Sequence, residues 1–283
     1  MGKTYVPSGD MPPRVAILRS LTPIPDDGFG SWSRRDKSKN ITLRNGGRSS
    51  EDRLWICRNN VASSTDAARG KASFTSGVHL FEFTWHQRHR GTHAVVGVAT
   101  KHAPLHTTGY RPLVGSNKES YGWELKSNCL LHDTDDTITI TDEKNDNQLG
   151  TERIYNDGNK APNSFEAVLD MDEGTLAFIA DGTYLGIAFH GLHNKKLFPI
   201  ISCVWGFCEI RMRHLASLPA LPSLFNKSAN TIRRNIRNIS DMLLLPLPRP
   251  IIKHLEEGFH NKEDTKNNKD EHRLCTIVIT IPC

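Results

Sequence analysis

The sequence predicts an all-β fold, an antiparallel β-sandwich, followed by a small C-terminal segment of α-helices, called the helical box below. Short apolar or alternating runs recur from residue 31 to about residue 215, and turn-forming residues separate them. No helical period lies between these runs, which argues against the βαβ units of a parallel sheet. After residue 215 the apolar period changes from about two to about four, and this change predicts the helical box.

Residues 1–30 are rich in Pro, Gly and Asp, so we expect a flexible lead-in there. In the strand predicted at His79–Trp85, apolar and polar residues alternate. Thr92–Thr100 is a more continuous apolar run, as expected of a strand that is buried on both faces. Asp172-Glu173-Gly174 and Asp181-Gly182 suit tight hairpin turns. Further strands are predicted at Phe165–Leu169, Thr175–Ala180, Tyr184–Phe189, Leu197–Cys203 and Glu209–Met212.

One segment interrupts this rhythm. Residues 133–164 contain eight acidic and three basic residues, with several Asn and Gly, and predict a long exposed loop. A calcium site is the alternative, but the acidic residues do not follow the alternate spacing, Gly and distal Glu of a calcium loop. We therefore expect solvated charges here and no metal.

The C-terminal part begins with an amphipathic helix in which Leu224, Ser228 and Ile232 are spaced four apart. The run Leu245-Pro246-Leu247-Pro248 cannot lie inside a helix, and a second short helix is expected to follow it. Residues 260–273 carry four basic and four acidic residues, which is typical of disorder. The predicted organisation is a sandwich at 31–215, a helical box at 216–259 and a disordered tail at 260–283.

Composition narrows the function classes. A hydrophobic content of 37% and a charged content of 24% indicate a globular protein, and a net charge of +5 does not by itself imply nucleic-acid binding. The six cysteines form no CxxC pair and no zinc spacing, so no metal or cofactor is expected. The first residues lack the apolar core of a signal peptide, and no apolar run is long enough to cross a membrane. These features predict a cytoplasmic protein, with the nucleus as a second compartment.

Six longer motifs occur along the chain: STDA (Ser64–Ala67), RGTHAVVGVAT (Arg90–Thr100), APLH (Ala103–His106), LDMDEGTL (Leu169–Leu176), DGTYLGIAFHGL (Asp181–Leu192) and VWGFCEIRMR (Val204–Arg213). In this order they resemble the SPRY domain-containing SOCS box protein family, and the resemblance extends roughly from Ser31 to Leu255. It implies a SPRY/B30.2-like sandwich followed by a SOCS box, in a substrate-recognition subunit of an elongin BC–cullin ubiquitin ligase.

The resemblance also implies a pocket for a short Asp/Glu-Ile-Asn-Asn-Asn peptide, built from loops at one end of the sandwich. At one position this chain departs from the family, because Asn60 stands where the family has Pro. The loss of Pro adds conformational entropy that binding must remove. The pocket positions are Arg58, Asn60, Ala62, Gly91, Thr92, Tyr110, Leu113, Val204, Trp205 and Gly206.

These residue types suit an asparagine-rich ligand, because buried amide side chains need hydrogen-bond partners at fixed positions. Glycine lets the backbone approach the ligand closely, and Thr92 and Tyr110 can add hydroxyl hydrogen bonds. Val204 and Trp205 would form an apolar wall, and Arg58 could meet the acidic end of the motif. Each residue also has a simpler alternative. Val204 and Trp205 could be core residues, and Tyr110 could be a loop anchor. Thr92 could be an ordinary strand residue and Arg58 a solvated charge.

In the box, the resemblance implies that elongin C binds Leu224, Ser228 and Ile232, and that the cullin binds Leu245, Pro246, Leu247 and Pro248. This Leu-Pro-Leu-Pro form suggests cullin five with its RING protein, and elongin B accompanies elongin C. Lys227-Ser228 departs from the family's Leu-Cys pair. A lost apolar contact costs about 1.5–3 kcal/mol, which weakens the expected elongin interface.

Three other functions are alternatives. An enzyme is disfavoured, because the sequence contains no nucleophile elbow, P-loop or metal triad. A nucleic-acid binder would use the basic helix face of Lys227, Arg233, Arg234 and Arg237, although such a face is more often solvated. The main rival is a peptide-binding module whose box no longer recruits the ligase.

Overall fold

The computed structural model describes residues 4–5, 9–24, 30–134, 153–155 and 160–220 and, nearer the C-terminus, residues 228, 231–232, 245–249, 251–252 and 255. The chain divides into two compact units, Met1–Ala220 and Leu221–Cys283. The predicted acidic loop lies largely outside the described residues, and the predicted tail at 260–283 lies entirely outside them.

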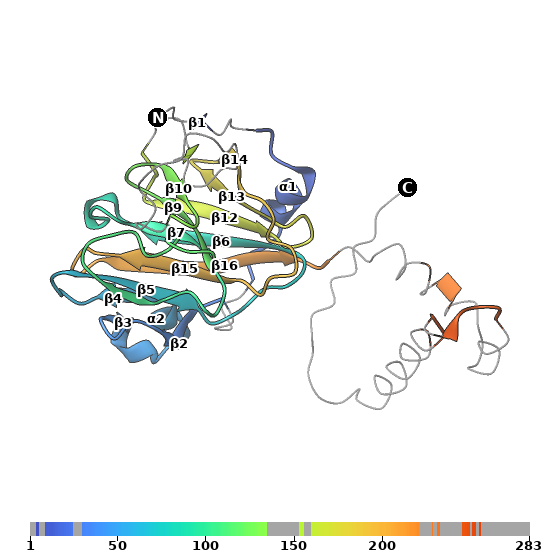
Figure 1. Ribbon diagram of the computed structural model, residues 1–283, viewed down its shortest axis with the longest axis horizontal. Coiled ribbons are helices and arrows are strands. Elements are labelled where there is room, and N and C mark those ends of the chain that lie inside the picture. The colour runs from blue at the N-terminus through green and yellow to red at the C-terminus, as the bar shows by residue number, and fades with distance from the viewer. Residues whose placement is uncertain are drawn as a thin grey trace, which may run out of the picture. The chain divides into compact units, whose positions relative to one another are not determined.

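The first unit is the predicted antiparallel β-sandwich (Figure 1). In one sheet the strand order is β1-β11-β10-β9-β7-β15-β5-β2, and β8 pairs with β5; the other sheet has the order β14-β13-β12-β6-β16-β4-β3. Every described pair is antiparallel except β1 with β11. The strands of the first sheet are β1 (Thr4–Tyr5), β2 (Trp32–Lys37), β5 (Ser64–Gly70), β7 (Val95–Ala99), β8 (His106–Thr108), β9 (Ser120–Glu124), β10 (Cys129–Leu131), β11 (Arg153–Ile154) and β15 (Phe198–Cys203). Those of the second sheet are β3 (Ile41–Leu43), β4 (Trp55–Arg58), β6 (Val78–Trp85), β12 (Ser164–Asp170), β13 (Thr175–Ala180), β14 (Thr183–Phe189) and β16 (Glu209–Leu218).

The helices of this unit are short. They are α1 (Pro13–Ser20), α2 (Ser50–Leu54) and the 3₁₀ turns η1 (Arg44–Gly47) and η2 (Gln87–His89). In α2, the Ser49 side chain accepts a hydrogen bond from the Asp52 N–H and the Asp52 carboxylate accepts one from the Ser49 N–H, which is a capping box. This local signal fixes where α2 begins.

The period-two pattern of β6 explains how the core is divided. Phe81, Phe83 and Trp85 point into the main core between the sheets, where they meet large side chains of the opposite sheet such as Trp123. Val78 and Leu80, on the other face of β6, belong to a second cluster outside the sandwich. One face of β6 is therefore buried between the two sheets, and part of its other face is buried in the second cluster.

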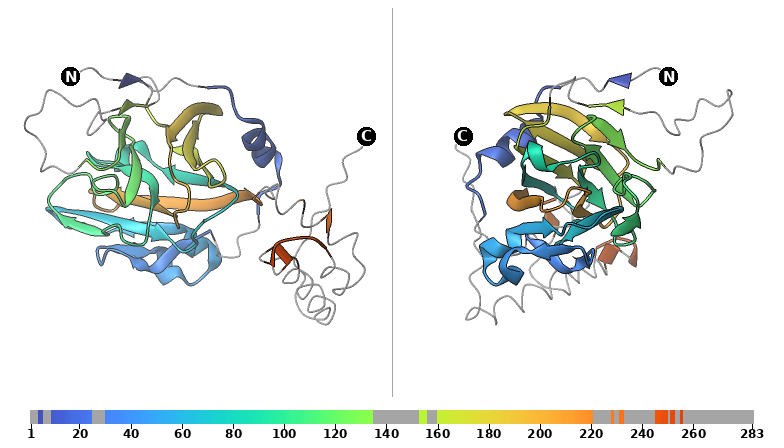
Figure 2. Two further views of the ribbon diagram at one scale, coloured as in Figure 1. Left: turned by 45° about the vertical axis from the view of Figure 1, so that its right-hand side comes forward. Right: turned by 90° about the vertical axis from the view of Figure 1, so that its left-hand side faces the viewer.

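Helix α1 forms that second cluster and corrects the prediction of a flexible lead-in at 1–30. Val15 and Leu18 are buried against β6 and its neighbours in the second sheet, and both figures show α1 beside these strands (Figures 1 and 2). Arg14 adds an ion pair to Asp172, with 2.8 Å between the nitrogen and the oxygen. Pro13 is the first helical residue, a position that proline fits, so the Pro-rich composition concealed a helix start.

The outer face of the first sheet is covered by the chain between β7 and β9. Leu113 and Val114 pack there on Ala67, Val95 and Ile200 in a third cluster. The Ala67 N–H donates to the Leu105 carbonyl at 2.9 Å, and β8 pairs with β5. The covering segment is thereby fixed on the sheet, and this segment carries Tyr110.

The second unit has its own small apolar cluster. Leu255 is buried, and Ile232, Leu245, Leu247 and Ile251 pack against it. The N–H groups of Ile251 and Ile252 both donate to the Pro248 carbonyl, at 2.9 and 3.2 Å, which begins the helical turn after the Leu-Pro-Leu-Pro run. Ser228 is exposed, and Leu224 lies outside the described residues.

Candidate functional site

Four connecting segments at one end of the sandwich enclose a groove of about 660 Å³. They follow β4, β6, β8 and β15, whose antiparallel pairing brings these strand ends to the same edge. The groove is lined by Asn60, Val61, His89, Gly91, Thr92, Tyr110, Val204, Trp205, Gly206 and Phe207.

Exposed aromatic side chains distinguish this groove from the rest of the described surface. Tyr110 is 54% exposed, Trp205 49% and Phe207 68%. Only two other large hydrophobic side chains among the described residues are exposed, Ile17 and Ile24, and neither is aromatic. Aromatic residues gathered around a concavity are typical of surfaces that bind protein or peptide. The alternative of Trp205 as a core residue is therefore wrong.

Two glycines shape the groove wall. Gly91 has φ of +66°, and a Cβ at this position would lie 3.1 Å from Val204 Cγ2 and 3.3 Å from Trp205 Cβ. At Gly206 a Cβ would lie 2.5 Å from Asn60 Oδ1. Glycine at these two positions therefore lets the three loops approach one another closely.

The segment between β15 and β16 is held from behind. The Phe207 N–H donates to the Arg58 carbonyl at 2.8 Å, and the Arg58 N–H donates to the Cys208 carbonyl at 3.1 Å. Phe207 itself has φ of +58°, a left-handed conformation that a bulky residue seldom adopts. Such a conformation persists only where neighbouring contacts enforce it. The hydrogen bonds to Arg58 therefore hold the backbone in a position that leaves the Phe207 ring exposed.

Tyr110 is fixed in a similar way from the covering segment. The Thr65 hydroxyl contacts the carbonyls of Gly109 and Arg111, each at 2.9 Å, and it accepts from the Arg111 N–H at 3.2 Å. Thr65 lies in β5 and is fully buried. The backbone on both sides of Tyr110 is thus tied to the sheet while its ring stays exposed.

Arg58 does not meet a ligand, contrary to the expectation that it reads an acidic group. Its side chain is 1% exposed, and Nε donates to Asp66 Oδ2 at 2.8 Å. Nη2 donates to the carbonyls of Val61 and Ser64, at 2.8 and 2.9 Å. Arg58 therefore shapes the loop that carries Asn60 and Val61 from inside the protein.

Asp66 is the centre of that buried network. Burial opposes ionisation of its carboxylate, but hydrogen bonds from Ser38, His106, Ser64 and Asn40 outweigh this effect and lower the pKa of Asp66. The carboxylate thus stays charged and balances the buried Arg58 guanidinium.

A second buried arginine fixes the loop after β6. Arg90 donates to the carbonyls of Trp85, Ala161 and Pro162, and burial lowers its pKa to about 10. This anchor lies directly before Gly91 in the sequence. The groove is therefore supported by two arginines, neither of which belongs to its surface.

Seven of the ten predicted pocket residues meet in this groove: Asn60, Gly91, Thr92, Tyr110, Val204, Trp205 and Gly206. Arg58 lies behind it, Ala62 is exposed beside it, and Leu113 is 3% exposed in the cluster beneath the covering segment. Val61, His89 and Phe207 also line the groove and were not predicted from the sequence. Each of them is adjacent to, or two residues from, a predicted residue, so extending the motif by a short margin would have found them.

Within the described ranges, no group of three or more His, Cys, Asp or Glu residues could hold a metal ion. No helix among the same residues is long and apolar enough to cross a membrane.

Comparison with known proteins agrees with this architecture. The SPRY domain family matches residues 78–213. Human SPRY domain-containing SOCS box protein 1 is 43% identical over 242 residues, which cover 84% of each chain. Protein gustavus of Drosophila melanogaster is 45% identical over 231 residues, covering 80% of this chain and 77% of that protein, and human SPRY domain-containing SOCS box protein 2 is 39% identical over 246 residues, covering 84% and 88%. The chain therefore belongs to the family of SPRY domain-containing SOCS box proteins.

Proposed function

We propose that this protein is a non-catalytic substrate receptor of an elongin BC–cullin ubiquitin ligase. Its sandwich binds a short asparagine-bearing peptide segment of the substrate, and its box recruits elongin C with elongin B, and cullin five with its RING protein. The observation that carries the proposal is the groove, with three exposed aromatic side chains around a concavity of about 660 Å³. The name of the family, which includes a SOCS box, supports the second half.

The groove offers the partners that an asparagine side chain needs. Thr92 and Tyr110 provide hydroxyl groups, Asn60 provides an amide, and Gly91 and Gly206 leave backbone within reach. Trp205 and Phe207 supply apolar surface that excludes water from these hydrogen bonds. The supporting loops are tied down before a ligand arrives, which reduces the entropy that binding must remove.

Calorimetry with an Asp-Ile-Asn-Asn-Asn peptide tests the groove. We expect Tyr110→Ala and Val204→Ala each to lower the affinity about tenfold or more, because both remove part of the wall. Ile17→Ala is the matched control, because Ile17 is an exposed apolar residue of α1 that does not line the groove. If both groove variants bind the peptide as tightly as the wild type, the groove is not the site.

Co-purification with elongins B and C tests the box. The full chain should retain both elongins, and the double variant Leu224→Ala, Pro246→Ala should lose them. In the described part of the box, Leu245 and Leu247 pack on Leu255 while Pro246 and Pro248 are exposed, so a partner can reach the prolines. Full recovery of elongins by the double variant would contradict the role of the box.

A peptide-binding module without ligase recruitment is the second candidate. Lys227-Ser228 favours it, because a charged and a polar residue stand where the family has an apolar pair. Ser228 is exposed, so the hydroxyl is available to whatever binds that face. Restoring the pair with Lys227→Leu, Ser228→Cys should raise elongin recovery if this departure weakens the interface.

A further inference from the structure

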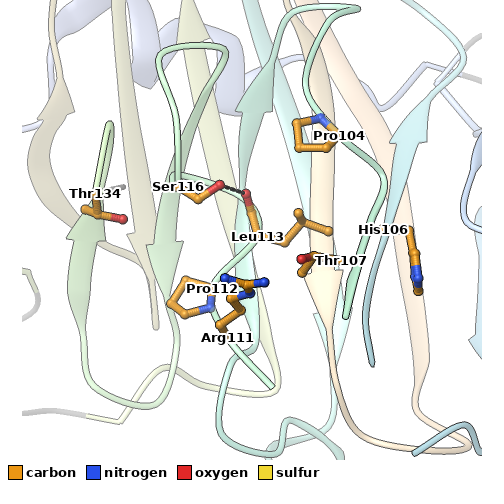
Figure 3. A pocket seen from close by; sticks show the side chains of 8 residues that line it. All are labelled: Pro104, His106, Thr107, Arg111, Pro112, Leu113, Ser116 and Thr134. Atoms are coloured by element: carbon orange, nitrogen blue, oxygen red, sulfur yellow. Dashed lines mark hydrogen bonds between the residues drawn. The ribbon is translucent and has the colours of Figure 1, made fainter. Parts of the chain in front are cut away.

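A second cavity of about 220 Å³ lies on the covering segment, next to the groove. Figure 3 shows Arg111 and Pro112 between Thr134 on one side of this cavity and His106 on the other. Pro104, Thr107, Leu113 and Ser116 complete the lining, and none of the eight residues is acidic.

Consecutive residues of the covering segment line the groove and the cavity. Tyr110 lines the groove and the next residue, Arg111, lines the cavity. The Thr65 hydroxyl holds the backbone at both ends of this pair, since it contacts the carbonyls of Gly109 and Arg111. Because one extended residue spans about 3.3–3.6 Å, a peptide that leaves the groove across Tyr110 reaches the cavity within a few residues.

Arg111 gives the cavity its charge. Its Nε donates to the Thr108 carbonyl at 3.3 Å, and within the described residues no hydrogen bond or ion pair engages the two Nη groups. These two groups form the planar fork that binds a carboxylate in a bidentate manner. The Thr107 hydroxyl lies in the same lining as a further donor.

Among the residues that the structure describes, no ion pair includes Arg111. His106 Nδ1 is 2.9 Å from Asp66 Oδ1, and the Asp66 carboxylate is fully buried and also paired with Arg58. The side chain of His106 is 44% exposed, so its second ring nitrogen is on the solvent side of that contact. Asp133, which precedes Thr134, forms no ion pair with a described residue.

We propose that this cavity is an accessory subsite that receives an acidic side chain of the same peptide segment that occupies the groove, with Arg111 as its carboxylate partner. The inference rests on the proposed peptide-binding function and assigns a specificity residue to it. Pro104, Pro112 and Leu113 suit the aliphatic stem of a Glu or Asp, while Arg111 and Thr107 bind its carboxylate. A Glu or Asp that flanks the asparagine core would thus be bound separately from the core itself.

Three peptides with the same asparagine core test the subsite by calorimetry on the full chain. One has neutral Gln residues on both flanks, one has two Glu residues before the core and one has two Glu residues after it. Since the cavity adjoins the groove on one side, only one Glu peptide can reach it. We expect that peptide to bind roughly three- to tenfold more tightly than the neutral peptide, and the other Glu peptide to bind as tightly as the neutral peptide.

Arg111→Gln should abolish that preference and leave the affinity for the neutral peptide unchanged. Arg35→Gln, at an exposed arginine of β2, is the control and should keep the preference. The subsite is wrong if the preference survives Arg111→Gln, or if the wild type binds all three peptides equally. If the wild type binds none of the three, the proposed peptide function fails and the subsite with it.

Discussion

At the scale of single residues, the width of the groove depends on Gly91. The positive φ of this residue disfavours other side chains, and a Cβ here would push Val204 and Trp205 outward by a few tenths of an ångström. Gly182, in the turn between β13 and β14, also has a positive φ, of +77°, but a Cβ added there would meet no atom within 4 Å. Substitution of either glycine strains the backbone, but only substitution of Gly91 also crowds the groove. A comparison of the two variants therefore distinguishes these effects.

We expect Gly91→Ala and Gly182→Ala each to lower the free energy of unfolding by about 1–2 kcal/mol, from the strained backbone. Only Gly91→Ala should also weaken peptide binding, by about tenfold or more, because it displaces the groove wall. Denaturant titration and calorimetry of both variants provide the two readouts. Equal peptide affinities for the two variants would show that the wall tolerates the added methyl group.

Asp66 gives a prediction about pH. Because the folded state lowers its pKa, the stabilisation is complete above the unfolded value of about 4 and is lost as the pH falls through the folded pKa. Asp66→Asn should cost about 3–5 kcal/mol near pH 7, since it leaves the Arg58 charge buried without its partner.

The difference in unfolding free energy between wild type and Asp66→Asn should then shrink below about pH 4. Asp181→Asn, at an exposed hairpin tip, is the control and should change stability by less than about 0.5 kcal/mol. A pH-independent difference for Asp66→Asn would contradict the assignment of a depressed pKa.

The sequence predicted the residues that line the groove better than the buried residues that hold its loops in place. Gly91, Thr92, Tyr110 and Trp205 meet as expected. The role of Arg58 could not be read from the sequence, because its burial depends on Asp66, which lies on a strand of the other sheet. A single arginine in a sequence carries no sign of whether the fold supplies a buried counter-charge.

At the scale of elements, α1 shows where composition misleads. Pro, Gly and Asp suggested a flexible segment, yet two apolar side chains three residues apart, Val15 and Leu18, are buried against the second sheet. Ion pairs from Arg14 and Arg19 add to this contact. The strands that were predicted were those with clear alternation or long apolar runs. Strands β2 and β4 contain charged residues and β3 has only three residues, so their apolar period was too weak to predict them.

The contribution of α1 can be measured directly. We expect Leu18→Ala to lower the free energy of unfolding by about 2–5 kcal/mol, because Leu18 is fully buried between the helix and the sheet. Ile17→Ala is the neighbouring control, and 51% exposure of Ile17 predicts a change below about 0.5 kcal/mol. Equal effects from the two variants in urea titrations would mean that α1 does not stabilise the sandwich.

At the scale of the whole molecule, the sandwich is confirmed, and the chain divides into two compact units. The observed division after Ala220 lies close to the predicted one at 215, and β16 continues to Leu218 because its last residues still pair with β6. Two compact units suit an adaptor, in which one unit binds the substrate and the other binds the ligase. The proposal needs both activities in one chain at the same time.

Reconstitution of a three-part complex tests that claim most directly. The full chain, elongins B and C, and a carrier protein fused to the Asp-Ile-Asn-Asn-Asn peptide would be mixed and separated by size-exclusion chromatography with light scattering. The account predicts one complex that contains all components at equal stoichiometry. Elution of the carrier with the chain while the elongins elute separately would contradict it, and would identify the protein as a peptide-binding module alone.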